Sequence, residues 1–199
     1  MISPLLANIY LDPLDAAMAE RGYRMVRYAD DFVILCQSRE EADAALDLVR
    51  YWVSDNGLTL HPTKTHIGDC RQSGDGFEFL GYRFEAGRRF VRKKSLDKLA
   101  DSIREKTRRT RGVSLAQVIA ELNPVLRGWF QYFKQAHYTT FADLDGFIRR
   151  RLRSMLLKQK KRSHIGVGTL IHKTWPNAFF ANAGLFAMNT AWQAARRSR

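Results

Sequence analysis

Apolar residues recur at helical spacing over the first twenty residues of the chain. Leu6 and Ile9 fall on one side of such a helix, Ser3-Pro4 suits its first turn and Gly22 suits its end. We therefore expect a helix over about residues 3–21.

The period then changes, and two apolar runs flank a pair of acids. Residues 23–28, apart from two arginines, and residues 32–36 are mostly apolar and rich in aromatic and β-branched side chains, with Asp30 and Asp31 between the two runs. This pattern is typical of a β-hairpin. Ser38, followed three residues later by an acid, predicts a capped helix that ends near residue 56.

A β pattern returns over residues 58–69 and 77–93, with a bulge expected at Gly81 and a turn at Gly87. After Lys94 the apolar period becomes 3.6 and stays there. Helix starts are expected at or after these residues: Ser95, Ser114, Asn123-Pro124, Thr140 and Gly184. The expected fold is an α+β part followed by an all-α part.

Charge divides the chain in the same way. Residues 1–80 hold 7 Lys/Arg and 13 Asp/Glu, a net of −6, whereas residues 81–199 hold 26 and 7, a net of +19. A strongly basic domain commonly binds a polyanion, above all nucleic acid. A basic surface without any partner remains the plainer interpretation.

Other compositional features exclude several classes of protein. No apolar run approaches ~18 residues, so no membrane partner is expected. Cys36 and Cys70 form no Cys-x-x-Cys pair, which argues against a zinc site or a disulfide framework. A reduced, cytoplasmic protein is therefore expected.

The acidic pair at the tip of the hairpin is the clearest candidate for chemistry. Asp30 and Asp31 repel each other when both are charged, so a nearby cation would stabilise them. Carboxylate oxygens suit Mg²⁺, which usually shares a few of them with substrate phosphates. A plain turn is the alternative, because aspartate favours turns.

Four stretches of residues 2–85 resemble reverse transcriptases: ISPLLANIYLDPLD, YADD between apolar strands, GLTLHPTKTHI and FEFLGYRF. The resemblance implies a polymerase palm that uses Mg²⁺, a primer-template and deoxynucleotides. It implies that Asp30 and Asp31 bind the metal, and that Lys64 assists departure of pyrophosphate. The implied primer-binding residues are Tyr28, Phe79, Leu80 and Gly81. A solvated Lys64 and a glycine at an ordinary β-bulge are the plainer alternatives for two of these positions.

The basic half carries an aromatic stripe in LNPVLRGWFQYF and a cationic run after it. Trp129, Phe130 and Phe133 at helical spacing are typical of a core, and Arg127 could lie along the surface. Eight cations without an acid occur in residues 149–162, which favours phosphate contact over a merely solvated face.

Residues 95–175 resemble the maturase domain of group II intron-encoded proteins, through LNPVLRGW and FADLDGFIRRRLRSMLLKQ. The resemblance implies a polymerase thumb that also binds the RNA of a group II intron, which is a mobile element, and aids its splicing. The expected division is a partial palm (1–94), a thumb/maturase domain (95–175) and a basic C-terminal helix or tail (176–199). The expected RNA-binding residues are Arg127, Arg149, Arg150, Arg153, Lys158, Lys160, Lys161 and Arg162.

The family places a further metal-binding strand and the fingers before ISPLLANIYL, and the chain starts at that motif. We therefore expect a C-terminal fragment that is catalytically incomplete by itself, with an upstream polymerase fragment as a partner. A non-catalytic RNA-binding splicing factor, or a decayed copy, is the alternative to an enzyme.

Overall fold

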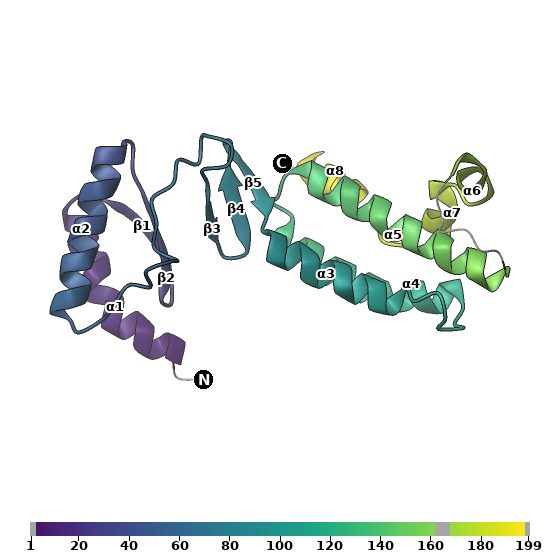
Figure 1. Cartoon of the computed structure of the whole chain (residues 1–199), viewed down its shortest axis with the longest axis horizontal. Coiled ribbons are helices and arrows are strands. Elements are labelled where there is room, and N and C mark those ends of the chain that lie inside the picture. The colour runs from purple at the N-terminus through teal and green to yellow at the C-terminus, as the bar shows by residue number, and fades with distance from the viewer. Residues whose placement is uncertain (1–2, 162–167, 198–199) are drawn as a thin grey trace. The chain divides into compact units, whose positions relative to one another are not determined.

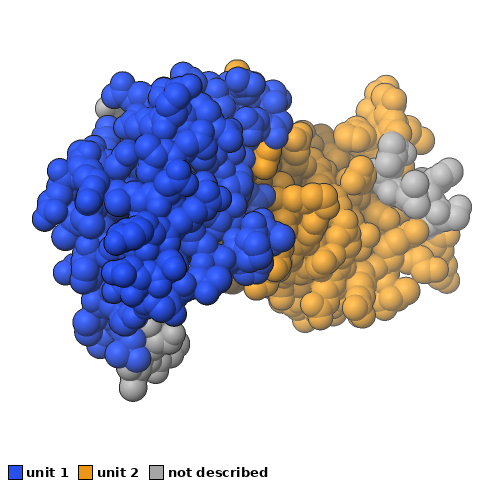
Figure 2. All heavy atoms as spheres, turned by 60° about the vertical axis from the view of Figure 1, so that its left-hand side comes forward, with its two compact units in different colours: residues 1–80, 84–87 blue, residues 81–83, 88–199 orange. Residues whose placement is uncertain are grey.

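The computed structural model describes residues 3–161 and 168–197, and the chain separates into two compact units (Figure 1 and Figure 2). Unit 1 comprises residues 1–80 and 84–87, and unit 2 comprises residues 81–83 and 88–199. The described elements are α1 (Ser3–Glu20), β1 (Arg24–Tyr28), β2 (Asp31–Leu35), α2 (Arg39–Asp55), β3 (Phe77–Phe79), β4 (Tyr82–Glu85), β5 (Arg88–Val91), α3 (Lys93–Lys106), α4 (Leu115–Phe133), α5 (Tyr138–Gln159), α6 (Thr169–Thr174), α7 (Asn177–Asn182) and α8 (Met188–Arg197). This confirms a mixed α/β chain.

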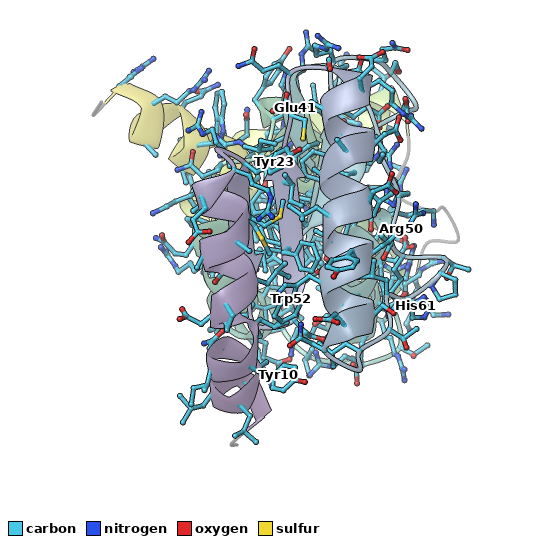
Figure 3. All side chains as sticks on the ribbon, turned by 90° about the vertical axis from the view of Figure 1, so that its left-hand side faces the viewer. Tyr10, Tyr23, Glu41, Arg50, Trp52 and His61 are labelled. Carbon is cyan, nitrogen blue, oxygen red and sulfur yellow. The ribbon has the colours of Figure 1, made fainter. Side chains whose placement is uncertain are left out.

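In unit 1, α1 and α2 lie side by side, run in opposite directions and share a core with the β1–β2 hairpin (Figure 3). The predicted cap of α2 is present, because Ser38 Oγ accepts a hydrogen bond from Glu41 N at 3.1 Å. Tyr10 Oη donates to Asn56 O at 2.7 Å, which joins the first half of α1 to the end of α2. The fully buried core side chains are Leu14, Met18, Ala45 and Val49.

The strand expected over residues 58–69 is wrong, since residues 58–76 form turns and irregular structure. Pro62 has no N–H for a ladder, and side chains satisfy the backbone locally instead. Asp69 Oδ1, for example, accepts from Arg71 N at 2.9 Å. The Arg71 hydrogen bonds to Asp69 are also the main reason that the pKa of Asp69 falls to about 2.

Strands β3, β4 and β5 form a three-stranded sheet in that order, with a two-residue turn at each connection. Leu80 and Gly81 have φ of 48° and 82°, and Ala86 and Gly87 have φ of 50° and 67°. Two successive positive φ angles are the requirement of a type I′ hairpin turn. The bulge expected at Gly81 is therefore wrong, whereas the turn at Gly87 is confirmed.

The core of unit 2 lies between α3, α4, α5 and α8. It contains Phe130 and Phe133 from α4, and half-buried Trp129 packs against it. The aromatic stripe is therefore core, as its helical spacing indicated. Helices α3 and α5 begin at Lys93 and Tyr138, two residues before the predicted starts at Ser95 and Thr140.

The predicted break at Asn123-Pro124 is wrong, because α4 continues through it from Leu115 to Phe133. Burial of Leu122 and Leu126 on one continuous face outweighs the lost N–H of the proline. The carbonyl that this N–H would have met belongs to Ala120, whose residue is exposed to water. Asn123 is not a cap: its Nδ2 donates to Gly184 O and its Oδ1 accepts from Phe186 N, both at 2.8 Å.

Helix α8 is held at its first turn by a buried carboxylate of α5. Asp145 accepts hydrogen bonds from Met188 N and Asn189 N, each at 3.1 Å. These two amides are first-turn donors that have no partner inside their own helix. Figure 1 shows α8 beside the first half of α5.

Within residues 3–161 and 168–197, none of the helices has the length and apolar character that a membrane crossing requires.

Asn123→Ala is expected to lower the free energy of unfolding by about 1–3 kcal/mol, because it leaves two backbone groups near α8 without partners. Asn123→Asp keeps the acceptor for Phe186 N and loses the donor to Gly184 O, so it should fall between Ala and the parent. Urea unfolding of the three proteins measures this. Equal urea midpoints for Asn123→Ala and the parent would show that the Asn123 hydrogen bonds to residues 184 and 186 do not stabilise the fold.

Candidate functional site

The β1–β2 hairpin presents its acids at an exposed tip. The strands are antiparallel with Tyr28 opposite Asp31, so Ala29 and Asp30 form the connecting turn. Ala29 has a φ of 55°, in the left-handed region. Asp30 and Asp31 are both exposed. The two carboxylates predicted to bind metal are thus neighbours at a solvent-accessible turn.

The two faces of β1 differ. Met25 packs toward the core of unit 1 and Arg27 is half-buried on the same face, whereas Val26 and Tyr28 are 49% and 66% exposed on the other. Tyr28, the predicted primer contact, therefore presents its ring to solvent beside the acids.

Arg27 joins the hairpin to α1. Its Nε lies 2.9 Å and 3.0 Å from the two carboxylate oxygens of Asp15, and its Nη1 donates to Asn8 Oδ1 at 3.0 Å. The same Nη1 donates to Ala29 O at 2.9 Å. One guanidinium therefore connects two turns of α1 to the carbonyl that precedes Asp30.

The positive charge of Arg27 is balanced by the negative charge of Asp15. The pKa of Arg27 is raised, chiefly by its hydrogen bond to Asp15, and its side chain is only 10% exposed. A bidentate arginine–carboxylate pair of this kind fixes orientation as well as charge. Arg27 lies outside the motifs that indicate the site, and the one signal for it in the sequence is a cation on the inward face of a mostly apolar strand.

Lys64 is exposed in the turn of residues 62–64. Its backbone N–H donates to His61 O at 3.3 Å. No hydrogen bond or ion pair in the described part of the chain joins Lys64 to Asp30 or Asp31. The structure thus places the predicted catalytic lysine in a loop, without bringing it to the acids.

The predicted primer-binding residues 79–81 end β3 and form the following turn. Phe79 and Leu80 are half-buried, and Gly81 is buried. A Cβ on Gly81 would lie 3.3 Å from the Phe133 ring, so both the positive φ and this close packing favour glycine there.

The cations of α5 and of the residues just after it occupy different environments. Arg150 and the three lysines Lys158, Lys160 and Lys161 are exposed. Arg149 is half-buried, 4.0 Å from Asp145. Lys160 Nζ also lies 5.1 Å from the centre of the Trp175 ring. Arg162, the last predicted RNA contact in this run, lies outside the described residues.

Arg153 contradicts the expectation that it faces RNA, because it is 2% exposed. Its Nε donates to Trp175 O and its Nη2 to Asn177 Oδ1, each at 2.9 Å, and its guanidinium lies over the Phe180 ring. Every third or fourth position of α5 faces the core, and Arg153 falls on that face. It holds α7 and the residues before it against α5.

Arg127 of α4 is exposed, and its guanidinium lies 4.6 Å from the centre of the Phe186 ring. It therefore rests on an aromatic surface while its donors stay accessible.

Within the described ranges, no group of three or more His, Cys, Asp or Glu side chains is placed to hold a metal ion. The Asp30–Asp31 pair nonetheless offers hard carboxylate oxygens in water, which fits Mg²⁺ as part of a ligand set.

Comparison with known families matches each half of the chain separately. The family model of the reverse transcriptase (RNA-dependent DNA polymerase) matches residues 1–84. The family model of the group II intron maturase-specific domain matches residues 96–175. A search of curated proteins found no match to the chain.

Arg27→Ala is expected to lower the free energy of unfolding of unit 1 by about 1.5–3 kcal/mol, because charge-assisted hydrogen bonds are lost. Arg27→Lys should recover part of this, since an ammonium cannot reproduce the bidentate contact. Denaturant unfolding monitored by NMR of the hairpin amides measures the change.

The control is Arg24→Ala, which removes an exposed cation from the other face of the same strand. It should change the free energy of unfolding by less than about 0.5 kcal/mol. A similar loss in Arg24→Ala and Arg27→Ala would show that the tie to Asp15 contributes nothing specific.

Proposed function

Since the chain belongs to the family of group II intron-encoded reverse transcriptases/maturases, we propose that it supplies two working surfaces to such a protein. One is a carboxylate pair for Mg²⁺ in RNA-directed DNA synthesis. The other is a cationic helical surface for intron RNA. The observation that carries the proposal is the exposed Asp30–Asp31 tip on a hairpin anchored to α1 by Arg27.

Unit 1 is the candidate palm and the helices of unit 2 are the candidate thumb/maturase domain. The helix-and-hairpin core of unit 1 and the mainly helical core of unit 2 support this assignment. The finer division into residues 1–94, 95–175 and 176–199 stays a prediction. Because each half matches its own family model, a polymerase-derived protein is favoured over an RNA-binding factor alone.

Asp30 and Asp31 would hold Mg²⁺, which when bound supplies positive charge for the reacting phosphate and hydroxyl oxygens. Tyr28 would lie beside the primer end, as its exposed ring on the same hairpin allows. Phe79, Leu80 and Gly81 would support the primer backbone. Lys64, exposed in its turn, would neutralise the pyrophosphate of a deoxynucleotide.

On unit 2, the exposed cations of α5 and of the two residues after it would contact RNA phosphates together with Arg127. These are Arg150, Lys158, Lys160 and Lys161, whose side chains reach solvent. Arg149 would contribute through its remaining exposed donors. Arg153 is removed from this set because its guanidinium is used inside the fold.

Residues 1–199 alone are expected to bind a divalent ion weakly and not to extend a primer. Two carboxylates without a further ligand should give millimolar or weaker affinity. Titration with Mn²⁺, read as paramagnetic broadening of the Tyr28 and Phe32 amides, measures the affinity. Nucleotide incorporation on an annealed RNA template measures the chemistry.

Asp30→Asn with Asp31→Asn should abolish the broadening, whereas Asp12→Asn on α1 should leave it unchanged. Robust primer extension by the parent that disappears in Asp30→Asn would contradict the proposed incompleteness. Broadening that survives in the double variant would place the ion elsewhere.

The RNA surface is tested by replacing Arg150, Lys158 and Lys161 together with alanine. Affinity for a structured group II intron fragment should fall, and the slope of log K against log salt should flatten by roughly one unit per lost phosphate contact. Binding is measured across salt concentrations, with an unrelated RNA of equal length beside the intron fragment.

A matched control removes three exposed arginines of unit 1: Arg39, Arg50 and Arg71. The change in net charge is the same, so an equal effect on RNA binding would mean that total charge, and not α5, is responsible. Arg153→Ala should instead lower the free energy of unfolding by about 1.5–3 kcal/mol, because its buried hydrogen bonds are lost.

A further inference from the structure

A row of aromatic rings lies where β5, the start of α5 and α8 meet in unit 2. Successive ring centres are 5.6 Å apart for Phe90 and His137, 4.5 Å for His137 and Tyr138, and 5.8 Å for Tyr138 and Trp192. Arg196 lies at the end of the row, with its guanidinium carbon 4.6 Å from the centre of the Trp192 ring. None of these residues belongs to the motifs considered above.

The row is rigidly held and partly open. His137 N donates to Arg89 O at 2.7 Å, and Trp192 Nε1 donates to Ala136 O at 3.1 Å. Tyr138 is nevertheless 49% exposed, although it is the first residue of a 22-residue helix with a well-packed core. An aromatic ring that is held by packed neighbours and still has exposed area is suited to a stacking ligand.

The charged side chains around the row are mostly cations. Burial lowers the pKa of the His137 imidazole, and the nearby cations Arg88 and Arg196 lower it further. Residues 86–96 and 122–199, which supply the row and its neighbours, contain only two acids, Asp143 and Asp145 of α5, and Asp145 is buried and accepts hydrogen bonds from the first turn of α8. A partner for this surface should therefore carry negative charge as well as flat apolar faces.

We propose that Tyr138, flanked by His137, Trp192 and Arg196, is a stacking platform for an unpaired base of RNA. Nucleotides combine both required properties, because each base has a π face and each linkage carries a phosphate. A paired base has its faces covered by its neighbours in the helix, so loops, bulges and single strands are the expected ligands. This inference rests on the proposed RNA-binding function of unit 2 and adds a specific contact to it.

The test compares an unstructured RNA strand with a blunt-ended RNA duplex of equal length, using the whole chain. Tyr138→Ala should weaken binding of the single strand by about 5- to 150-fold, the usual range for loss of one base–aromatic stack. The factor should be the same at every salt concentration, because no phosphate contact is lost. Binding to the duplex, whose bases are all paired, should change by less than about twofold.

Matched variants separate stacking from charge and from folding. Tyr138→Phe keeps the ring and should bind as the parent does. Tyr138→Leu keeps an apolar contact with Trp192 and should weaken single-strand binding while leaving the unfolding midpoint near that of the parent. Arg196→Ala should instead flatten the salt slope of the single strand by about 0.7.

An RNA that carries one abasic position within the bound stretch provides an independent arm. It should lose affinity for the parent by a similar factor, and Tyr138→Ala should add little further loss. Such non-additivity is expected only if the missing base and the missing ring contact each other.

Several outcomes would overturn the platform. If the parent binds RNA and Tyr138→Ala binds each of the two RNAs as tightly as the parent does, the row is only the edge of the core. If the parent self-associates in sedimentation experiments and Tyr138→Ala does not, with RNA binding unchanged, the row is an interface between copies. If the parent binds neither RNA, the proposed RNA-binding function itself fails.

Discussion

The guanidinium of Arg27 is the constraint on which the arrangement of the candidate metal-binding tip depends. A two-stranded hairpin is marginally stable by itself, and its turn has no regular structure to fix it. Here one planar group contacts Asp15 and Asn8 on α1 and the carbonyl of Ala29 in the turn. The position of the turn that carries Asp30 is thereby tied to a helix whose own face is buried by Leu14 and Met18.

Residue types and their spacing predict correctly those parts of the chain in which hydrogen bonds join residues close in sequence. The Ser38 cap and the hairpin around Asp30 follow from residue type and spacing, and both are present. Where a tertiary partner competes with the local one, the local rule fails. Asn123 resembles a cap in sequence, yet its amide bonds to residues 184 and 186, and the helix continues through Pro124.

The same distinction applies to the candidate sites. Asp30 and Asp31 are neighbours because they are adjacent in the chain, whereas Lys64 lies in a separate exposed turn and has no hydrogen bond or ion pair with either acid among the described residues. The run of arginines on α5 was treated as one surface, because residue type carries no information about which face is buried. Arg150 reaches solvent, whereas Arg151 donates to Thr107 and to the carbonyl of Arg104 at the end of α3, and Arg153 lies inside.

The carboxylate of Asp145 has a consequence for the motions of α8. A ten-residue helix is marginal in isolation, so α8 persists because of its neighbours. The amides of Met188 and Asn189, which in most helices would exchange freely with solvent deuterium, are instead bonded to a side chain that is 4% exposed. Protection should therefore be highest at the beginning of α8 and decline toward Arg197, the reverse of the usual order in which the first-turn amides exchange fastest. Fraying would then begin at the cationic end of the helix, while its first turn stays fastened to α5.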